Sequence, residues 1–157
     1  MQEPAVVHST FVIERSFPTS PERVFAAFTD PAKKRRWFAE GGDHDIDEFT
    51  SEFRVGGTEK LRYRLGKSTP FPGVELINES RYQDIVPGQR IVTAATMDLG
   101  GKRISVSLVT YEFVKTEKGT DLILTHQGTF FEGSGGPELR EIGWKKLLDN
   151  LAAEVAR

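Results

Sequence analysis

The fold is decided by the stretch PELREIGWKKLLDNLAAEV, residues 137–155. Its apolar side chains recur every three or four residues, which is the period of one face of an α-helix. They are Trp144, Leu148, Leu151 and Val155, and the stripe is widened by Leu139, Ile142 and Leu147. Pro137 suits the first turn of a helix, where its missing N–H needs no partner. The stretch therefore predicts one long helix whose apolar face must pack against another element.

The region before this helix, residues 44–130, has the two-residue period of β-strands. Turn dipeptides divide it at Gly56-Gly57, Pro87-Gly88, Gly100-Gly101 and Lys118-Gly119. The expected strands are His8–Phe17 near the start, one holding Phe49, Ser51, Phe53 and Val55, one holding Leu61, Tyr63 and Leu65, and then Val74–Val86, Gln89–Asp98, Lys102–Lys115 and Thr120–Phe130. Strands joined by such short turns predict an antiparallel sheet.

One of these strands, Lys102–Lys115, changes the parity of its apolar residues. The series is Ile104, Val106 and Leu108, then Val109, Tyr111 and Phe113, one residue out of step. A slip of one residue within a strand is what a β-bulge produces, and bulges bend sheets. We therefore expect the sheet to be curled.

Two short helices are expected between the first strand and the rest of the sheet. Ser20 can cap the first helix and Pro21 suits its first turn, ahead of an apolar stripe of Val24, Phe25 and Phe28. The dipeptide Asp30-Pro31 repeats this start signal, so a second short helix should carry Lys33 to Phe38.

This order of elements predicts the α+β class, with a curved antiparallel sheet of about seven strands wrapped around the long C-terminal helix. The chain of 157 residues is the length of a single domain, residues 1–157. The formal net charge of −2 offers no field for nucleic acid, and no apolar run is long enough to span a membrane. Cysteine is absent, which excludes disulfides and thiolate nucleophiles, and the N-terminus has no leader pattern, so a cytoplasmic location is expected.

Five motifs follow one another in the order and spacing of a known family. They are Val24-Phe25 with Phe28-Thr29-Asp30-Pro31 and Arg36-Trp37-Phe38; Phe53-Arg54-Val55-Gly56-Gly57; Ile85-Val86-Pro87 with Arg90-Ile91-Val92; Gly119-Thr120-Asp121-Leu122 through His126; and Gly143-Trp144 with Leu148 and Leu151. From Phe11 to Ala153 the chain resembles the family of domains akin to the activator of the Hsp90 ATPase, within the START-like, or helix-grip (SRPBCC), superfamily that includes polyketide cyclases. The resemblance implies seven antiparallel strands gripping the last helix, with an apolar cavity between them.

Aromatic and apolar residues near this expected cavity are the candidate ligand-binding residues. Four lie near segment ends, where a mouth would be, two could line the interior, and the others come from the last strand and the last helix. The set is Trp37, Phe38, Phe71 and Phe130; Tyr63 and Met97; and His126, Trp144 and Leu148.

His126 is the only candidate catalytic residue that stands out among three histidines. It shares parity with Leu122 and Leu124 on the last strand, so it could act as a general base or a hydrogen-bond anchor in the cavity. The alternative is a histidine with satisfied hydrogen bonds at the end of the strand. No histidine stands in metal-ligand spacing, and no cofactor motif is present, so neither a metal nor a cofactor is expected.

Three further clusters allow a functional and a structural interpretation. The acidic group Asp43, Asp45, Asp47 and Glu48 around His44 could hold a cation, but a solvated start of a strand is the simpler interpretation. The basic run Lys33–Arg36 is interpreted as a solvated helix face, and Gly133–Gly136 as a flexible lead-in to the last helix rather than a phosphate cradle.

Binding of a small hydrophobic molecule, lipid-, steroid- or polyketide-like, is the expected function, in a carrier, a sensor or a sequestering protein. A cyclase- or hydrolase-like enzyme using the same cavity is the alternative, with His126, Tyr63 or Glu79 as acid or base. An Hsp90-type chaperone partner ranks lower. The chaperone-stimulating domain of the eukaryotic activator lies upstream of the similar region, and no such domain is expected upstream of Val6 here. Unpaired strands at the sheet edges would allow a homodimer.

Overall fold

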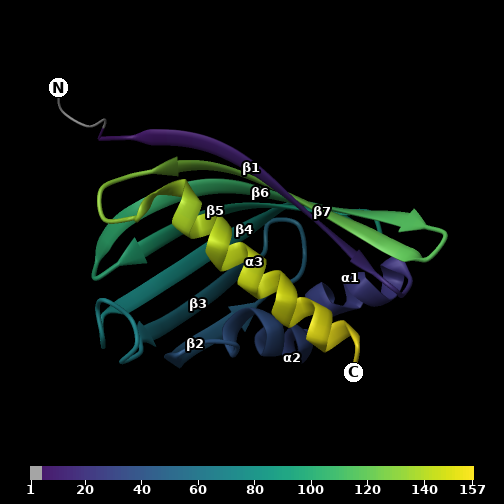
Figure 1. The fold of residues 1–157 in the computed structure, drawn as a ribbon, viewed down its shortest axis with the longest axis horizontal. Helices are drawn as coiled ribbons and strands as arrows, with labels where there is room; N and C mark the ends of the chain where they lie inside the picture. Colours follow the sequence, from purple (N-terminus) through teal and green to yellow (C-terminus); the bar gives the residue numbers. More distant parts are fainter. Residues whose placement is uncertain (1–4) are drawn as a thin grey trace.

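The computed structural model describes residues 5–157, which form one seven-stranded antiparallel sheet and a set of helices (Figure 1). The elements in chain order are β1 (Val7–Phe17), α1 (Pro21–Thr29), α2 (Pro31–Lys34), η1 (Arg35–Ala39), β2 (His44–Ser51), β3 (Thr58–Leu65), β4 (Glu75–Val86), β5 (Arg90–Leu99), β6 (Lys102–Thr116), β7 (Gly119–Phe130) and α3 (Gly136–Val155). The strand order across the sheet is β1-β7-β6-β5-β4-β3-β2. Strands β2 to β7 therefore pair in sequence order, and β1 pairs with β7 at one edge of the sheet. The predicted fold class is confirmed.

Helix α3 lies across the concave face of the curved sheet, and its C-terminal end lies beside α1 and α2 (Figure 1). The predicted stripe of Trp144, Leu148, Leu151 and Val155 is buried against this face. The proposed widening of the stripe is wrong for Leu139 and Ile142, which are 57% and 61% exposed. The first turns of α3 therefore do not rest on the core as the last turns do. Among residues 5–157, no helix combines the length and the apolar character needed to cross a membrane.

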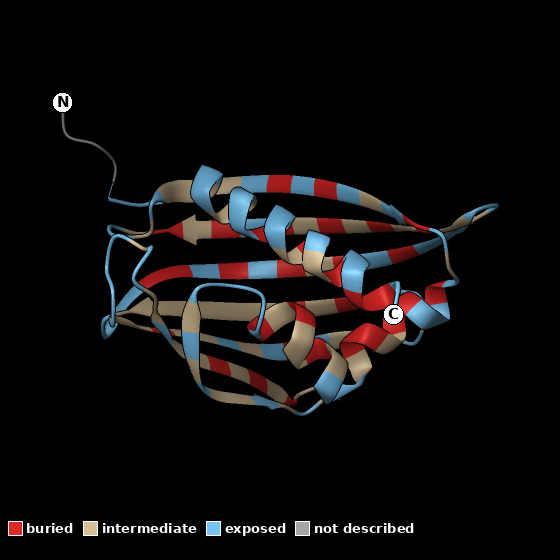
Figure 2. Ribbon diagram, turned by 60° about the horizontal axis from the view of Figure 1, so that its bottom comes forward, coloured by how far each residue is buried: buried red, intermediate tan, exposed pale blue. Residues whose placement is uncertain are grey.

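The parity slip in β6 is a β-bulge, but it lies earlier than the apolar pattern suggests. Met97 pairs with Ser105 and the next residue of β5 pairs with Arg103, so Ile104 is the extra residue. Val106 and Leu108, which belong to the apolar series before the slip, are 42% and 39% exposed. The residues that alternate with them face the concave side of the sheet instead, and the first two of these are Ser105 and Ser107. Figure 2 shows this alternation of buried and exposed positions along the strands.

The two short helices begin at the predicted capping residues. The Ser20 side chain accepts a hydrogen bond from the Arg23 N–H, and the Asp30 side chain accepts from the N–H groups of Ala32 and Lys33. The second helix continues into η1, a single π-helical turn that carries Trp37 inward. Capping by short polar side chains is a local property, which explains why the sequence locates these helix starts well.

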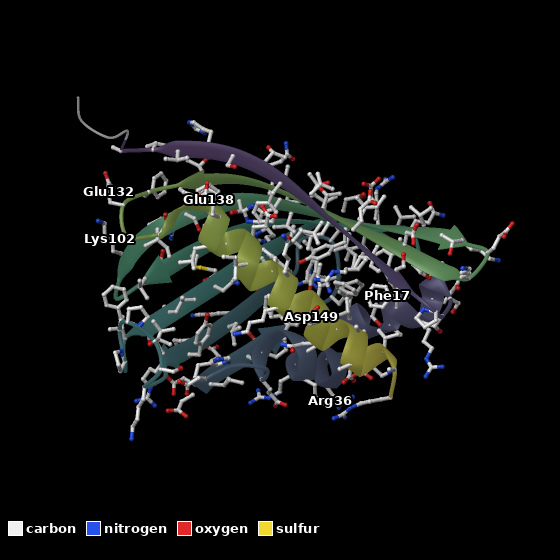
Figure 3. All side chains as sticks on the ribbon, viewed as in Figure 1. Phe17, Arg36, Lys102, Glu132, Glu138 and Asp149 are labelled. Carbon is white, nitrogen blue, oxygen red and sulfur yellow. The ribbon has the colours of Figure 1, made fainter. Side chains whose placement is uncertain are left out.

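The basic run from Lys33 to Arg36 is not the solvated face that was predicted. Lys34 is only 3% exposed and its ammonium forms an ion pair with Glu59, at 3.4 Å. Arg36 lies beside the C-terminal end of α3 and forms a bidentate ion pair with the buried Glu154 (Figure 3). This ion pair holds the pKa of Glu154 below its usual range and ties the short helices to α3.

Candidate functional site

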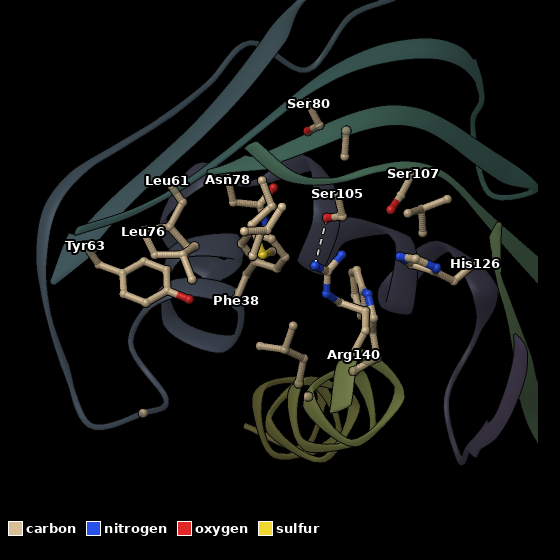
Figure 4. A pocket seen from close by; sticks show the side chains of 18 of the residues that line it. Phe38, Leu61, Tyr63, Leu76, Asn78, Ser80, Ser105, Ser107, His126 and Arg140 are labelled. Atoms are coloured by element: carbon tan, nitrogen blue, oxygen red, sulfur yellow. Dashed lines mark hydrogen bonds between the residues drawn. The ribbon is translucent and has the colours of Figure 1, made fainter. Parts of the chain in front are cut away.

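A cavity of about 520 Å³ lies between the concave face of the sheet and the first half of α3 (Figure 4). This is within the range of about 300–1,000 Å³ that is usual for small-molecule sites. Its walls come from strands β3 to β7, from α3, from the loop that joins β3 to β4, and from α2, η1 and the residues that follow η1. Phe71 of that loop and Leu139 of α3 both line the cavity and are more than half exposed, so they mark its opening.

Six of the nine predicted ligand-binding residues line this cavity. They are Phe38, Tyr63, Phe71, Met97, His126 and Trp144. Much of the remaining surface is aliphatic, from residues such as Leu61, Leu76 and Ile91. The cavity wall is therefore largely apolar, with a small number of polar groups placed within it.

The other three predicted residues lie outside the cavity lining and belong to packed regions around it. Trp37 is 1% exposed, and its indole N–H donates a hydrogen bond to the carbonyl oxygen of Ala27, which holds it in the core. Leu148 faces the buried core under α3. Phe130 lies behind His126, with ring centroids 5.9 Å apart. Glu79, a predicted alternative acid or base, is exposed, because its neighbours Asn78 and Ser80 take the inward positions of β4.

Polar side chains from three elements converge at one end of the cavity, shown in Figure 4. Ser105 and Ser107 come from β6 beyond the bulge, His126 from β7, and Arg140 from the second turn of α3. The Arg140 guanidinium donates a hydrogen bond of 2.8 Å to the Ser105 hydroxyl oxygen. It also lies over the ring of Phe130, 5.2 Å from the ring centre. We call Ser105, Ser107, His126 and Arg140 the polar cluster.

His126 is a neutral imidazole in this cluster. It is 1% exposed and stacks on Phe11, with ring centres 4.6 Å apart. Burial, reinforced by the nearby positive charge of Arg140, lowers the pKa of His126 to about 4. Its Nδ1 atom is buried and has no hydrogen-bond partner among the described residues. A pKa this low makes the ring a weak base, which is poorly suited to accepting a proton near neutral pH.

Arg140 is a partly buried cation that forms no ion pair with a carboxylate of residues 5–157. Burial lowers the pKa of Arg140 to about 10, so the guanidinium remains charged at neutral pH. In the part of the chain that the structure describes, no Asp or Glu oxygen lies within 4.0 Å of it. Burial also raises the pKa of Tyr63, another lining residue, which keeps its phenol neutral.

A second polar group of the cavity wall is satisfied internally. Glu59 forms an ion pair with Lys34, and its carboxylate accepts hydrogen bonds from the hydroxyls of Ser51 and Tyr82, at 3.1 and 2.9 Å. The Lys34 ammonium also lies 4.5 Å from the ring centre of Phe38. Burial and the Glu59 charge raise the pKa of Tyr82, so it acts as a hydrogen-bond donor here. The Lys34–Glu59 network is closed and presents no unpaired charge to the cavity.

Arg140 could have been recognised in the sequence as a charged residue on the apolar face of the last helix. Arg140 stands four residues before Trp144, so it lies on the helix face that carries the apolar stripe. A charged residue within such a stripe needs either a partner or a function. Ser105 and Ser107 gave no signal, because they alternate with the apolar residues Ile104, Val106 and Leu108 in the sequence. Lys34 and Glu59, separated by 25 positions, share no local signal at all.

The acidic segment at the start of β2 is tied to its neighbours by polar contacts. Asp43 accepts hydrogen bonds from the backbone N–H and the hydroxyl of Ser68, which lower the pKa of its carboxyl. Asp47 forms an ion pair with Arg64, and Glu48 with Arg62. Within residues 5–157, no three His, Asp or Glu side chains are grouped as they would be to hold a metal ion.

A curved antiparallel sheet that holds one long helix over a cavity defines the helix-grip, START-like class of domains. The model of the family described as "Activator of Hsp90 ATPase homolog 1-like protein" matches residues 18–156, and the chain belongs to this family. No protein of curated function matches it.

Three solved structures illustrate the relationship. The Mll3558 protein of Rhizobium loti is 45% identical, with 96% of this chain and 99% of that chain covered and a TM-score of 0.85. A protein of Rhizobium leguminosarum is 37% identical, with 97% of each chain covered and a TM-score of 0.87. The AHSA1-like protein of Aeromonas hydrophila, 22% identical with 94% and 92% covered and a TM-score of 0.68, shows the fold alone.

Proposed function

We propose that this protein binds a small, largely apolar molecule in the cavity between the sheet and α3, and that it carries, senses or sequesters that molecule. The main support for this proposal is the cavity itself, a space of about 520 Å³ that the surrounding apolar side chains leave unfilled. Atoms that face an empty space lose the dispersion contacts they would make in a packed core. A ligand of lipid-, steroid- or polyketide-like character would restore these contacts.

Binding is supported better than catalysis by the chemistry of the polar cluster. A general base needs a pKa near the working pH, whereas the pKa of His126 is lowered to about 4. A catalytic histidine is also usually oriented by a third group, and the buried Nδ1 atom of His126 has no partner among the described residues.

The test uses N-phenyl-1-naphthylamine, an uncharged aromatic molecule whose fluorescence rises in apolar surroundings. Ala95 lies between the cavity-lining residues Ser80 and Ser107 in the sheet, so Ala95→Phe would place a ring in the cavity. Ala94→Phe is the matched control, because Ala94 pairs with the outward-facing Leu108. We expect the wild type and Ala94→Phe to bind the probe and Ala95→Phe to lose most of its affinity. Equal binding by both variants would contradict the proposal.

A second candidate function, stimulation of an Hsp90-type ATPase, is favoured only by the family description. It predicts that the purified protein raises the ATP turnover of such a chaperone. The absence of any change at micromolar concentrations would remove this candidate and leave ligand binding as the sole proposal.

A further inference from the structure

We infer that the ligand of this cavity carries a single carboxylate and that the polar cluster holds it, with Arg140 as the main contact. This inference rests on the proposed function and specifies its chemistry. The ligand is thus an aliphatic or aromatic monocarboxylic acid, whose apolar part lies along the remainder of the cavity.

The first argument is the unpaired positive charge. A guanidinium has five N–H donors, and Arg140 uses one hydrogen bond to Ser105 within the described residues. Placing a charge in an apolar region costs free energy unless an opposite charge or hydrogen bonds compensate it. The planar guanidinium matches the two oxygens of a carboxylate in a bidentate contact.

The second argument comes from atoms other than those of Arg140. Two buried side-chain atoms of the described residues lack a hydrogen-bond partner, the hydroxyl oxygen of Ser107 and Nδ1 of His126. Both residues line the cavity at the same end as Arg140 (Figure 4). Ser107 and His126 are 6% and 1% exposed, so solvent scarcely reaches them. A carboxylate can accept about four hydrogen bonds, enough for the guanidinium, the Ser107 hydroxyl and an Nδ1–H tautomer of His126.

The third argument is the contrast with the Lys34–Glu59 pair, which also lines the cavity. The Lys34 charge is balanced by Glu59, which is itself satisfied by two hydroxyl groups. Lys146 also lines the cavity, but its side chain is exposed to solvent. Among the described lining residues that are at least half-buried, Arg140 is therefore the one cation without an ion-pair partner, and a monoanion would neutralise it. A phosphate dianion would leave an excess negative charge among apolar side chains.

The apolar part of the ligand has a defined place as well. Leu61, Leu76 and Tyr63 line the cavity on the side away from His126 (Figure 4), and Met97 provides a flexible wall. A molecule with one polar end and one apolar body fits this division of the lining, whereas a uniformly polar molecule does not.

The experiment measures displacement of N-phenyl-1-naphthylamine by three molecules with the same chain: decanoic acid, 1-decanol and decyl phosphate. We expect decanoate to displace the probe at concentrations about ten- to a hundredfold lower than decanol, as for hydrogen bonds to a charged group. Arg140→Gln should bind the uncharged probe normally and lose the preference for the acid. Arg90→Gln is the matched control, because Arg90 is exposed and pairs with Asp84 outside the cavity lining.

The outcomes separate this inference from the proposed function. Equal displacement by acid and alcohol, a preference kept in Arg140→Gln, or stronger displacement by decyl phosphate would overturn the carboxylate inference and leave the proposed function intact. Failure of the wild type to bind any of the four molecules would overturn both. If Arg140→Gln does not fold, Ser107→Ala and Arg140→Lys replace it. Each of these variants should bind the probe normally and show a smaller preference for decanoate over decanol. An unchanged preference in both variants would refute the inference.

Discussion

The buried imidazole of His126 should make the stability of this protein fall when the pH drops below neutral. The pKa of His126 is about 4 in the folded protein and 6.5 in an unfolded chain. Because the folded pKa is the lower one, the unfolded chain takes up the proton first as the pH falls. The stabilisation from this site is therefore complete above about pH 6.5 and is lost progressively towards pH 4.

The expected magnitude follows from the same two values. Each pH unit within this window costs about 1.4 kcal/mol, so a change from pH 7.5 to about pH 5 removes about 2 kcal/mol of unfolding free energy. The positive charge that faces His126 is that of Arg140 on α3. It acts in the same direction as burial, because it also disfavours the protonated ring.

Urea unfolding of the wild type and of His126→Phe at the two pH values provides the assay. Phenylalanine keeps the stacking on Phe11 and Phe130 and removes the titrating group. We expect the variant to lose about 2 kcal/mol less than the wild type between pH 7.5 and pH 5. Other titrating groups are common to both proteins and cancel in this difference. An identical pH dependence in the two proteins would refute the assigned protonation state.

Three further predictions concern packing and pairing around the cavity. Glu59→Gln should lower the unfolding free energy by about 3–5 kcal/mol, because it leaves the buried Lys34 charge without its partner, and chemical denaturation would measure the loss. Gly128→Ala should cost about 1–3 kcal/mol in the same assay, because a Cβ there would lie 2.6 Å from the Phe130 ring, and a stability equal to the wild type would show that the ring moves freely. Trp37→Phe removes a buried indole N–H hydrogen bond of 2.8 Å, so thermal unfolding should show an unfolding free energy about 1–2 kcal/mol lower than that of the wild type. The affinity for N-phenyl-1-naphthylamine should stay unchanged.

Much of the architecture could be predicted because it depends on short-range patterns. The Ser20 and Asp30 caps locate the starts of α1 and α2 within one or two residues. The alternation in residues 119–130 identifies β7 and places His126 on its inner side. Both signals act over a few residues, and neither depends on what the chain packs against.

The interior of the cavity was predicted less well, because patterns of hydrophobicity assume that the inside is apolar. In β6 the apolar residues Val106 and Leu108 face outward, and the serines between and beside them face the cavity. A cavity reverses the usual rule, since its wall can hold polar groups that a ligand would satisfy. The same assumption concealed Arg140 within the stripe of α3.

Helical and strand periods and capping residues are encoded locally. The order of helices and strands, and the stripe from Trp144 to Val155 that α3 buries, could therefore be predicted from the amino-acid sequence. Which charges meet depends on how distant segments are brought together. Lys34 of α2 pairs with Glu59 of β3, whereas Arg140 of α3 pairs with no carboxylate within residues 5–157. Such pairings depend on the curvature of the sheet and on the distance between α3 and its concave face. Bulges bend a sheet, and the register shifts between β2 and β3, between β4 and β5 and between β5 and β6. The curvature therefore depends on several strands together with the packing of the core, and no short segment specifies it.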